Sequence, residues 1–274
     1  MISSLRVWLR RTHTGSFELV QYYSWYLIHY VPQLLLCRFS PAAKPTVQGF
    51  GGRNGALKLV TQLRSVNSLA PTKLCRIMTR HGSDKGRRWH NYTTVYAVLF
   101  DAFRDKPLRL FELGLGTDDP KLASTMGVVG LPGASLRGWR EYFPHALVYG
   151  ADIDRAILFQ DVRIKTFYCD QLNQASIREV WSHPELQDGV DLVIEDGLHT
   201  FEANISFLDE SLEQLRPGGI YIVEDIAQGC LDAWRDRIES TLIKKYQNYE
   251  FALVILPNRF NVMDNNLLVI HREE

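Results

Sequence analysis

Acidic side chains follow two apolar runs in the second half of the chain, and they could hold a metal ion. The run 190–194 leads to Asp196, and the run 219–223 leads to Glu224 and Asp225. If these runs are neighbouring parallel strands, the three carboxylates converge at one edge of a sheet. Carboxylates, water and substrate oxygens together form the octahedral shell that Mg²⁺ prefers. The pattern predicts a divalent-cation site, and the simpler alternative is that Glu224 or Asp225 caps a helix or pairs with a nearby cation.

A histidine three residues after Asp196 adds a possible proton acceptor. An alcohol is a poor nucleophile, but coordination to a metal lowers its pKa, and a neutral imidazole near pH 7 can then remove the proton. A lone histidine is usually structural or solvated. The neighbouring acids favour a catalytic role for His199 as a general base.

Glycines close the apolar run 108–113. Glu112, Gly114 and Gly116 form the pattern E-x-G-x-G, in which glycine lets the backbone approach a ligand closely. The dinucleotide fingerprint G-x-G-x-x-G is absent, because Asp119 stands where its last glycine belongs. The pattern disfavours a dehydrogenase and is typical of S-adenosylmethionine binding, although a glycine-rich turn after a strand can also be only a turn.

The next two apolar runs, 146–150 and 164–169, are also followed by acids. Asp152 could accept hydrogen bonds from both ribose hydroxyls of a nucleoside, and Asp170, which precedes Gln171, could accept from an adenine amino group. Each acid alone could be a helix cap or a solvated loop end. Three polar strand ends in register favour a cofactor site along this edge.

Seven apolar runs must position these residues. The runs are 108–113, 146–150, 164–169, 190–194, 219–223, 251–256 and 267–271. Their continuous apolarity indicates strands buried on both faces, and segments of helical period such as 201–215 lie between them. The sequence predicts an α/β protein with a mostly parallel, seven-stranded sheet, helices on both faces and a closing antiparallel hairpin.

The segments before the first of these runs are less regular. Residues 56–69 have the spacing of a short helix, and 79–96 reads as a polar loop that leads into a helix ending near Arg104. Residues 40–55 are rich in Pro and Gly and read as a linker. We therefore predict two parts, an N-terminal helical segment with its linker at 1–55 and the main domain at 56–274.

The N-terminal segment combines Arg6, Arg10 and Arg11 with an aromatic stretch, 17–39. Polar residues interrupt this stretch, and no apolar run of about 18 residues spans a membrane. We expect helices that pack on the main domain or on a second subunit, which would make a homo-oligomer. The alternative is an interfacial helix in peripheral contact with a membrane.

Composition narrows the functional classes. The 274 residues include 31 Lys and Arg and 31 Asp and Glu, so no net charge draws the chain to nucleic acid. The four cysteines show no metal-binding or disulfide spacing, which suits a reducing, cytoplasmic location.

Further pieces of the sequence match a known group of enzymes. They are His81-Gly82-Ser83-Asp84-Lys85-Gly86, His90-Asn91-Tyr92 and Gly133-Ala134-Ser135-Leu136-Arg137-Gly138-Trp139, together with the strand ends quoted above. From about residue 79 to 226 the chain resembles the Mg²⁺-dependent sugar O-methyltransferases of macrolide and related glycoside biosynthesis. The resemblance implies the class I methyltransferase (Rossmann-like) fold and an S-adenosylmethionine cofactor.

The resemblance also implies roles for residues. It implies that Asp196, Glu224 and Asp225 bind Mg²⁺ and that His199 is the base that removes the proton of the acceptor hydroxyl. It also implies that the segment 81–86 is a lid over the cofactor or the substrate. The cofactor residues are Glu112, Gly114, Gly116, Asp152, Asp170, Gln171, Ser135 and Arg137.

Departures from the family leave the acceptor open. Residues 117–132 form a long insertion that we expect to shape the acceptor side. The macrolide substrate of the family therefore cannot be assigned to this chain. The acceptor would be a sugar hydroxyl of a glycoside, glycolipid or polysaccharide. The alternatives are a phenolic or catechol acceptor and a non-catalytic partner protein with this fold, and the intact acids argue against the latter.

Overall fold

One sheet of nine strands organises the computed structural model, which describes residues 44–52, 58–68, 70–86, 89–127, 130–258 and 260–274. The strand order is β1-β8-β9-β7-β6-β2-β3-β5-β4. The strands are β1 Thr46–Gly51, β2 Leu108–Leu113, β3 Ala146–Asp152, β4 Gln160–Asp161, β5 Ile164–Tyr168, β6 Val190–Glu195, β7 Leu215–Val223, β8 Tyr249–Ile255 and β9 Asn266–Arg272.

The centre of the sheet is parallel, as the apolar runs predict. β5, β3, β2, β6 and β7 pair in parallel, and β9 and β8 add antiparallel strands beside β7. All seven predicted runs are strands, and they form seven consecutive positions of the sheet. Two strands not expected from the sequence, β1 and β4, extend its edges, so the sheet has nine strands rather than seven.

The predicted linker at 40–55 is wrong for Thr46–Gly51. This segment forms β1, which pairs antiparallel with β8 from Thr46 opposite Ile255 to Gly51 opposite Glu250. Val47 is buried, whereas Thr46 and Gln48 on either side are exposed, as in an edge strand with one covered face. The Pro and Gly residues around it hide this short alternation. The sheet therefore begins inside the part predicted to be separate, and residues 1–43, with the predicted N-terminal helices, lie outside the described residues.

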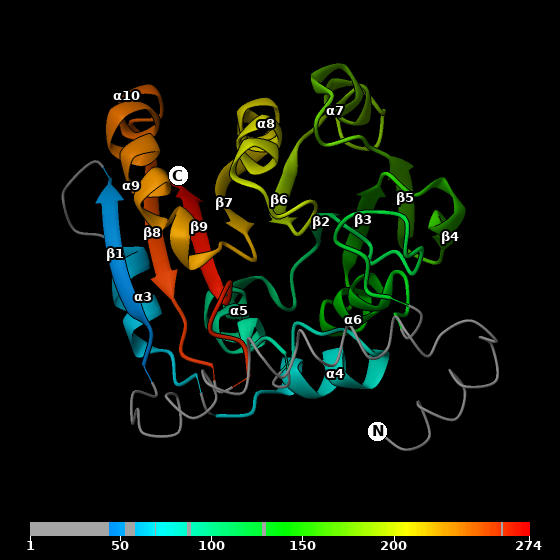
Figure 1. The fold of residues 1–274 in the computed structure, drawn as a ribbon, viewed down its shortest axis with the longest axis horizontal. Coiled ribbons are helices and arrows are strands. Elements are labelled where there is room, and N and C mark those ends of the chain that lie inside the picture. The colour runs from blue at the N-terminus through cyan, green and yellow to red at the C-terminus, as the bar shows by residue number, and fades with distance from the viewer. Residues whose placement is uncertain (1–43, 53–57, 69, 87–88, 128–129, 259) are drawn as a thin grey trace.

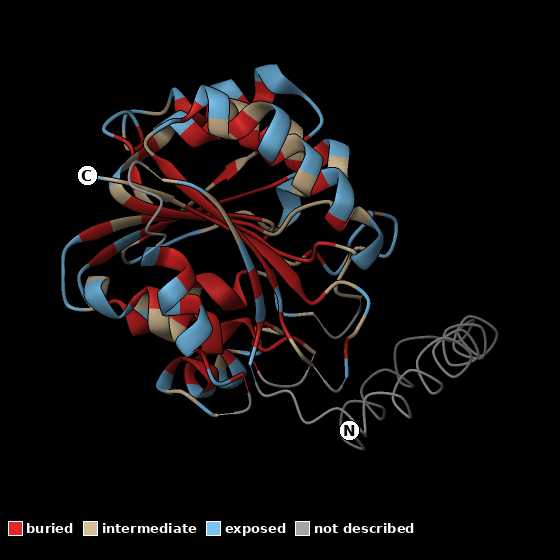
Figure 2. Ribbon diagram, turned by 90° about the vertical axis from the view of Figure 1, so that its left-hand side faces the viewer, coloured by how far each residue is buried: buried red, intermediate tan, exposed pale blue. Residues whose placement is uncertain are grey.

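Helices cover both faces of the sheet (Figures 1 and 2). α3, α4, α5 and α6 pack on one face, and α7, α8, α9 and α10 lie on the other, with the buried strands between them. The helices are α3 Lys58–Ser65, α4 Lys73–His81, α5 Tyr92–Leu99, α6 Ala134–Tyr142, α7 Gln174–Trp181, α8 Phe201–Ser211, α9 Leu231–Arg237 and α10 Ile243–Lys245. Shorter helical turns cover Asp101–Phe103, Arg155–Ile157, Leu212–Gln214, Gln228–Cys230 and Ile238–Leu242.

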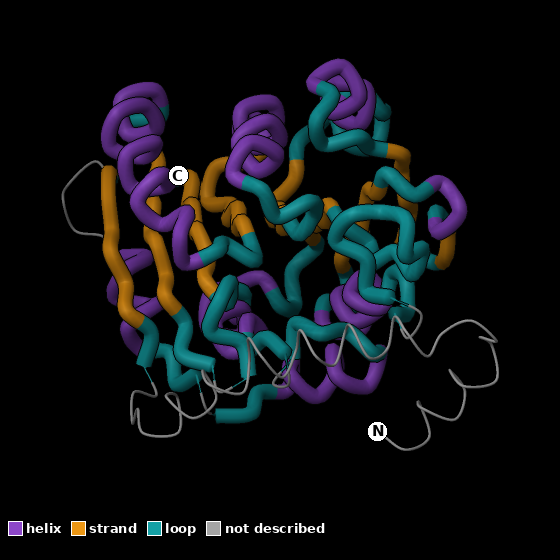
Figure 3. The backbone as a smooth tube through the Cα atoms, viewed as in Figure 1, coloured by secondary structure: helices purple, strands orange, loops and turns teal. Residues whose placement is uncertain are grey.

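The polar loop expected at 79–96 is shorter than predicted. α4 runs on to His81, because Leu74, Ile77 and Met78 bury one helical stripe, and the helix ends at Gly82 in a left-handed conformation. α5 already begins at Tyr92. Between these two helices, the described residues 82–86 and 89–91 form no helix or strand. Figure 3 shows the orange strands and purple helices joined by teal loops. No helix in the described ranges has the length and apolarity needed to cross a membrane.

Candidate active site

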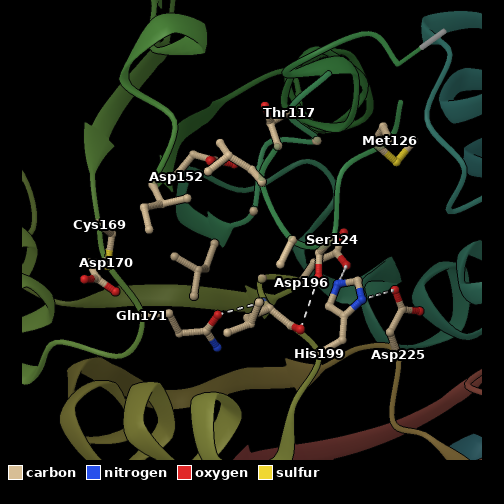
Figure 4. A pocket seen from close by; sticks show the side chains of 18 of the residues that line it. Thr117, Ser124, Met126, Asp152, Cys169, Asp170, Gln171, Asp196, His199 and Asp225 are labelled. Carbon is tan, nitrogen blue, oxygen red and sulfur yellow. Dashed lines mark hydrogen bonds and ion pairs between the residues drawn. The ribbon is translucent and has the colours of Figure 1, made fainter. Parts of the chain in front are cut away.

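A cavity lies at the carboxyl ends of β2, β3, β5, β6 and β7 (Figure 4). Parallel strands of such a sheet present their carboxyl ends to ligands. Residues predicted for the cofactor and for the metal line this one cavity. They include Gly114, Gly116, Asp152, Asp170, Gln171, Asp196, His199 and Asp225.

Gly114 brings the ends of β2 and β6 into direct contact. Its φ is 89°, and a Cβ on this residue would lie 1.8 Å from the carbonyl oxygen of Asp196. Gly116 also has a positive φ, 76°, and lies against Met126 of the insertion. Both positions favour glycine because of their positive φ, and at Gly114 a side chain would also force the two strand ends apart.

Asp152 forms part of the cavity wall at the end of β3. Its carboxylate accepts hydrogen bonds from the backbone N–H groups of Leu115 (2.7 Å) and Asp154 (2.8 Å), and burial raises the pKa of Asp152. Asp170 lies at the end of β5, where its Oδ1 accepts from the N–H of Leu172 (3.0 Å). Both carboxylates keep lone pairs for a ligand.

The other residues predicted for the cofactor lie in different surroundings. Glu112 is fully buried and accepts a hydrogen bond from Trp139 Nε1 (2.6 Å), and burial raises its pKa. Ser135 lines a smaller neighbouring cavity beside Asp196. Arg137 points elsewhere: its guanidinium lies 4.4 Å from the Phe159 ring centre and donates to the carbonyl of Pro132, and among the described residues it lines neither cavity.

A buried lysine joins three strand ends. Lys85 is 1% exposed, and its Nζ contacts Asp196, Glu224 (2.6 Å) and Glu112 (3.2 Å). Strand alternation directs Glu112 and Glu224 to the face covered by α4, α5 and α6, from which Lys85 enters. Burial acts to lower the pKa of Lys85, but the carboxylates of Asp196 and Glu224 raise it well above its usual value. Lys85 is therefore an ammonium ion.

Sequence reasoning missed this role for Lys85. The residue belongs to the matched segment 81–86, for which the resemblance implied a lid. Its side chain lies beneath the carboxylates, and Asp84 next to it lines the main cavity. At Lys85 the segment therefore forms a buried wall of the site rather than a lid. In the sequence, only the match of residues 81–86 to the family pointed to a role for Lys85.

His199 lies between two carboxylates (Figure 4). Its Nε2 is 3.2 Å from Asp196 Oδ1, and its Nδ1 is 3.4 Å from Asp225 Oδ2. His199 and Asp225 have positive φ values, 63° and 53°, which non-glycine residues rarely adopt. Such strained residues cluster at functional sites.

The charge of His199 follows from these neighbours. Burial favours the neutral imidazole, but Asp225 and Asp196 raise the pKa of His199 to about 10. The imidazole is then protonated at pH 7. The neutral form expected from the sequence therefore requires that another cation offset the charge of the two carboxylates.

Asp225 is held from its other side by the segment that begins α5. Tyr92 Oη donates to Asp225 Oδ1 (2.6 Å), and His90 Nδ1 lies 3.3 Å from the same oxygen. Asn265, in the loop between β8 and β9, lies 3.2 Å from His90 Nδ1 and donates to the side chain of Asn91. The matched residues 90–92 thus join this loop to the end of β7.

The donor set fits a hard cation. Three carboxylates, those of Glu112, Asp196 and Glu224, contact the buried ammonium of Lys85, and Asp225 adds a fourth carboxylate to the site. Asp196, His199 and Asp225 offer ligand atoms that all lie within 4.8 Å of one another. Carboxylate oxygens suit Mg²⁺, and the excess negative charge would be offset by a divalent ion. Glu224 lies apart from this group, because Lys85 and Tyr96 bind its carboxylate.

The insertion contributes to the same cavity. Thr117, Ser124 and Met126 line it, and Ser124 Oγ donates to the carbonyl of Leu198 (3.1 Å), immediately before His199. Ser124 therefore joins the insertion to the turn that carries Asp196 and His199, and the acceptor-shaping role of the insertion stays a prediction.

Known proteins resemble this chain in sequence. No family model matches it. The 8-demethyl-8-alpha-L-rhamnosyl tetracenomycin-C 2'-O-methyltransferase of Streptomyces olivaceus is 36% identical over 155 residues, which are 56% of this chain and 37% of that protein. The mycinamicin VI 2''-O-methyltransferase of Micromonospora griseorubida is 27% identical over 154 residues, 56% of this chain and 36% of that protein. The matches thus span well under half the length of these relatives.

Solved structures resemble its fold. The MycE methyltransferase in complex with Mg, S-adenosylhomocysteine (SAH) and mycinamycin VI superposes with a TM-score of 0.55 at 21% identity, over 80% of this chain and 60% of that chain. A second MycE structure with Mg and SAH gives the same TM-score at 22% identity, over 75% and 56%. The predicted fold is confirmed: the chain has the class I methyltransferase fold, and it resembles sugar O-methyltransferases.

Proposed function

We propose that the protein is an S-adenosylmethionine-dependent, divalent-metal-dependent O-methyltransferase that acts on a sugar hydroxyl of a glycoside, glycolipid or polysaccharide. One observation carries the proposal: Asp196, His199 and Asp225 meet at the rim of a cavity whose other wall is formed by the strand ends that hold a nucleoside cofactor in this fold. The sugar O-methyltransferases among the relatives support the choice of acceptor.

The cofactor would lie across the ends of β2, β3 and β5. Gly114 and Gly116 leave room for its backbone contacts, Asp152 would accept from the ribose hydroxyls, and Asp170 would accept from the adenine amino group. Glu112 and Ser135 would support the cofactor site indirectly, because Glu112 contacts Lys85 and Ser135 lines the smaller cavity together with Lys85. Arg137 has the weakest case of the predicted cofactor residues, because its guanidinium is engaged by Phe159 and Pro132.

The metal, Mg²⁺ or a similar divalent cation, would be held by Asp196 and Asp225, with Glu224 as the third predicted ligand. When bound, such a cation lowers the pKa of a coordinated hydroxyl. With the charge of Asp196 and Asp225 offset, the pKa of His199 returns toward a range in which the imidazole accepts a proton. Nε2 would take the acceptor's proton, while Nδ1 stays beside Asp225 and holds the ring in place.

Substitution of His199 tests the assignment of the base. His199→Ala is expected to lower turnover by about 10² to 10⁴, as loss of a general base does, with little change in the dissociation constant of the cofactor. His145→Ala, a change at an exposed histidine, is the matched control and should leave turnover unaltered. Near-normal turnover in His199→Ala would remove His199 from the reaction.

The same assay tests the metal and the acceptor. A chelator should abolish methyl transfer, and added Mg²⁺ should restore it. Glycosides and catechols are offered in parallel, with radioactive methyl transfer as the measurement. Transfer to catechols alone would assign the site to the phenolic class, and full transfer in chelator would exclude the metal.

A further inference from the structure

The side-chain amide of Gln171 joins two segments at the base-bearing end of the cavity. Gln171 follows β5 and is 7% exposed. Its Nε2 donates to Glu195 Oε1 (2.6 Å), and its Oε1 accepts from the backbone N–H of Leu198 (2.8 Å). Both polar ends of the amide are therefore used within the protein, on either side of Asp196.

The turn after β6 wraps around this amide. The N–H of Gly197 lies 3.3 Å from Glu195 Oε1, so Glu195 and Gln171 together bind two successive N–H groups of the turn. A Cβ at Gly197 would lie 2.1 Å from Gln171 Oε1, so the close approach requires glycine there. His199 follows directly, with its φ of 63°. The contacts hold the turn in a shape that a free loop would rarely adopt.

Strand alternation makes the arrangement two-sided. Glu195 is 1% exposed and points to the face of α7 and α8, opposite to the face from which Lys85 contacts Asp196. Gln171 and Glu195 thus hydrogen-bond to the turn on one side of the sheet, and Lys85 binds Asp196 on the other side. His199 follows this turn directly, and its Nε2 faces Asp196.

We infer that Gln171 is a positioning residue, which with Glu195 sets the place of His199 relative to the reacting hydroxyl, rather than a residue that binds the cofactor through its amide. The amide uses one of its two N–H donors on Glu195 and one acceptor lone pair on Leu198, so turning it toward a cofactor would break both contacts. Gln171 lines the cavity, so only the remainder of its surface is left for a cofactor. The inference rests on the proposed function, since it concerns the geometry of the proposed base.

An exchange of the two side chains tests the inference. In Gln171→Glu two carboxylates face each other, so the hydrogen bond between residues 171 and 195 is lost and the turn is held less firmly. We expect kcat to fall about 100-fold, the order expected when a catalytic group shifts by about 1 Å. In Gln171→Glu combined with Glu195→Gln, the new Glu accepts from the N–H of Leu198 and from the new Gln, whose oxygen accepts from the N–H of Gly197. This double variant should recover kcat to within about tenfold of the unaltered protein.

Matched variants make the rescue specific. Gln171→Leu cannot form either hydrogen bond, so Glu195→Gln should not rescue it. Gln187→Glu makes the same chemical change at an exposed position and should leave kcat unaltered. The dissociation constant of SAH, measured by calorimetry, should change far less than kcat in every variant. A large loss of SAH affinity in Gln171→Glu, with no recovery in the double variant, would overturn the inference and make Gln171 a cofactor ligand.

A measurement without turnover separates this inference from the proposed function. The imidazole NMR signals of His199, identified by their loss in His199→Ala, should move in Gln171→Glu and return in the double variant. Signals that stay in place in Gln171→Glu would overturn the positioning role. If no acceptor is methylated by the unaltered protein, the proposed function fails, while these signals still decide whether Gln171 positions His199.

Discussion

Asp196 binds different partners with its two carboxylate oxygens. Oδ2 contacts the buried ammonium of Lys85, and Oδ1 faces His199 Nε2 at 3.2 Å. The ammonium of Lys85 and the imidazole of His199 hold the pKa of Asp196 low despite its burial. Asp196 is therefore a carboxylate at neutral pH, as the proposed metal ligand must be.

Loss of Lys85 should destabilise the protein strongly. Lys85→Met leaves Glu112, Asp196 and Glu224 without their common counter-ion, and breaking a buried ion pair from one side costs about 3–5 kcal/mol. The measurement is urea denaturation in chelator. Lys165→Met removes a half-exposed pair with Glu185 and should cost no more than about 1 kcal/mol. Equal losses in the two variants would show that the cluster around Lys85 does not depend on its charge.

At the scale of elements, the site depends on how closely neighbouring strands end. β2 and β6 pair in parallel up to Leu113 opposite Glu195, and the next residues, Gly114 and Asp196, touch through their backbones. The N–H of Asp196 donates to the carbonyl of Leu113 (2.9 Å), so the pairing continues past the end of the strands. This contact sets the distance between the proposed cofactor site at the end of β2 and the carboxylate of Asp196.

Gly114→Ala should separate the two strand ends. The new Cβ would meet the Asp196 carbonyl at 1.8 Å, and the left-handed backbone alone costs about 1–2 kcal/mol for an alanine. We expect an unfolding free energy lower by at least that amount and weaker binding of SAH, measured by denaturation and calorimetry. Gly229→Ala, with no atom within 4 Å of its new Cβ, should be neutral in both. Unchanged SAH binding in Gly114→Ala would mean that this contact does not shape the cofactor wall.

For the whole molecule, the site is a concentration of negative charge in an otherwise neutral chain. The 31 basic and 31 acidic residues balance, yet the buried carboxylates of the site outnumber Lys85. Burial raises the pKa values of Glu112, Glu224 and Asp225, and it raises the pKa of Glu195 to about 7. Each of these groups binds its proton more tightly in the folded than in the unfolded state. The contribution of each group to the free energy of unfolding therefore falls as the pH rises.

Comparison of the unaltered protein with His199→Gln across pH isolates the contribution of His199. Its pKa is about 10 in the folded protein and about 6.5 in the unfolded chain. The stabilisation by His199 is therefore fully present below about pH 6.5 and is lost as the pH rises toward 10. In chelator, the difference in unfolding free energy between the two proteins should shrink over this window. A difference that grows with pH would contradict the assigned charge of His199.

The sequence by itself determined the elements that lie at the centre of the sheet and the chemistry at their ends. The apolar runs are short, local signals, and each predicted run is a strand. Because parallel strands end at a common edge, the acids that follow them had to meet there, as Asp152, Asp170, Asp196 and Asp225 do. The class I methyltransferase fold follows from the same pattern.

Only the tertiary structure decided which polar groups face each other. Three contacts depend on residues that are distant in the chain: Lys85 with Glu224, the Gln171 amide with Glu195 and Leu198, and Arg137 with Phe159. β1 likewise became a strand through its pairing with β8. Strand and helix periods are set by neighbours along the chain, whereas buried ions and amides are placed by partners brought together in folding, because a buried polar group must find a partner wherever the fold provides one.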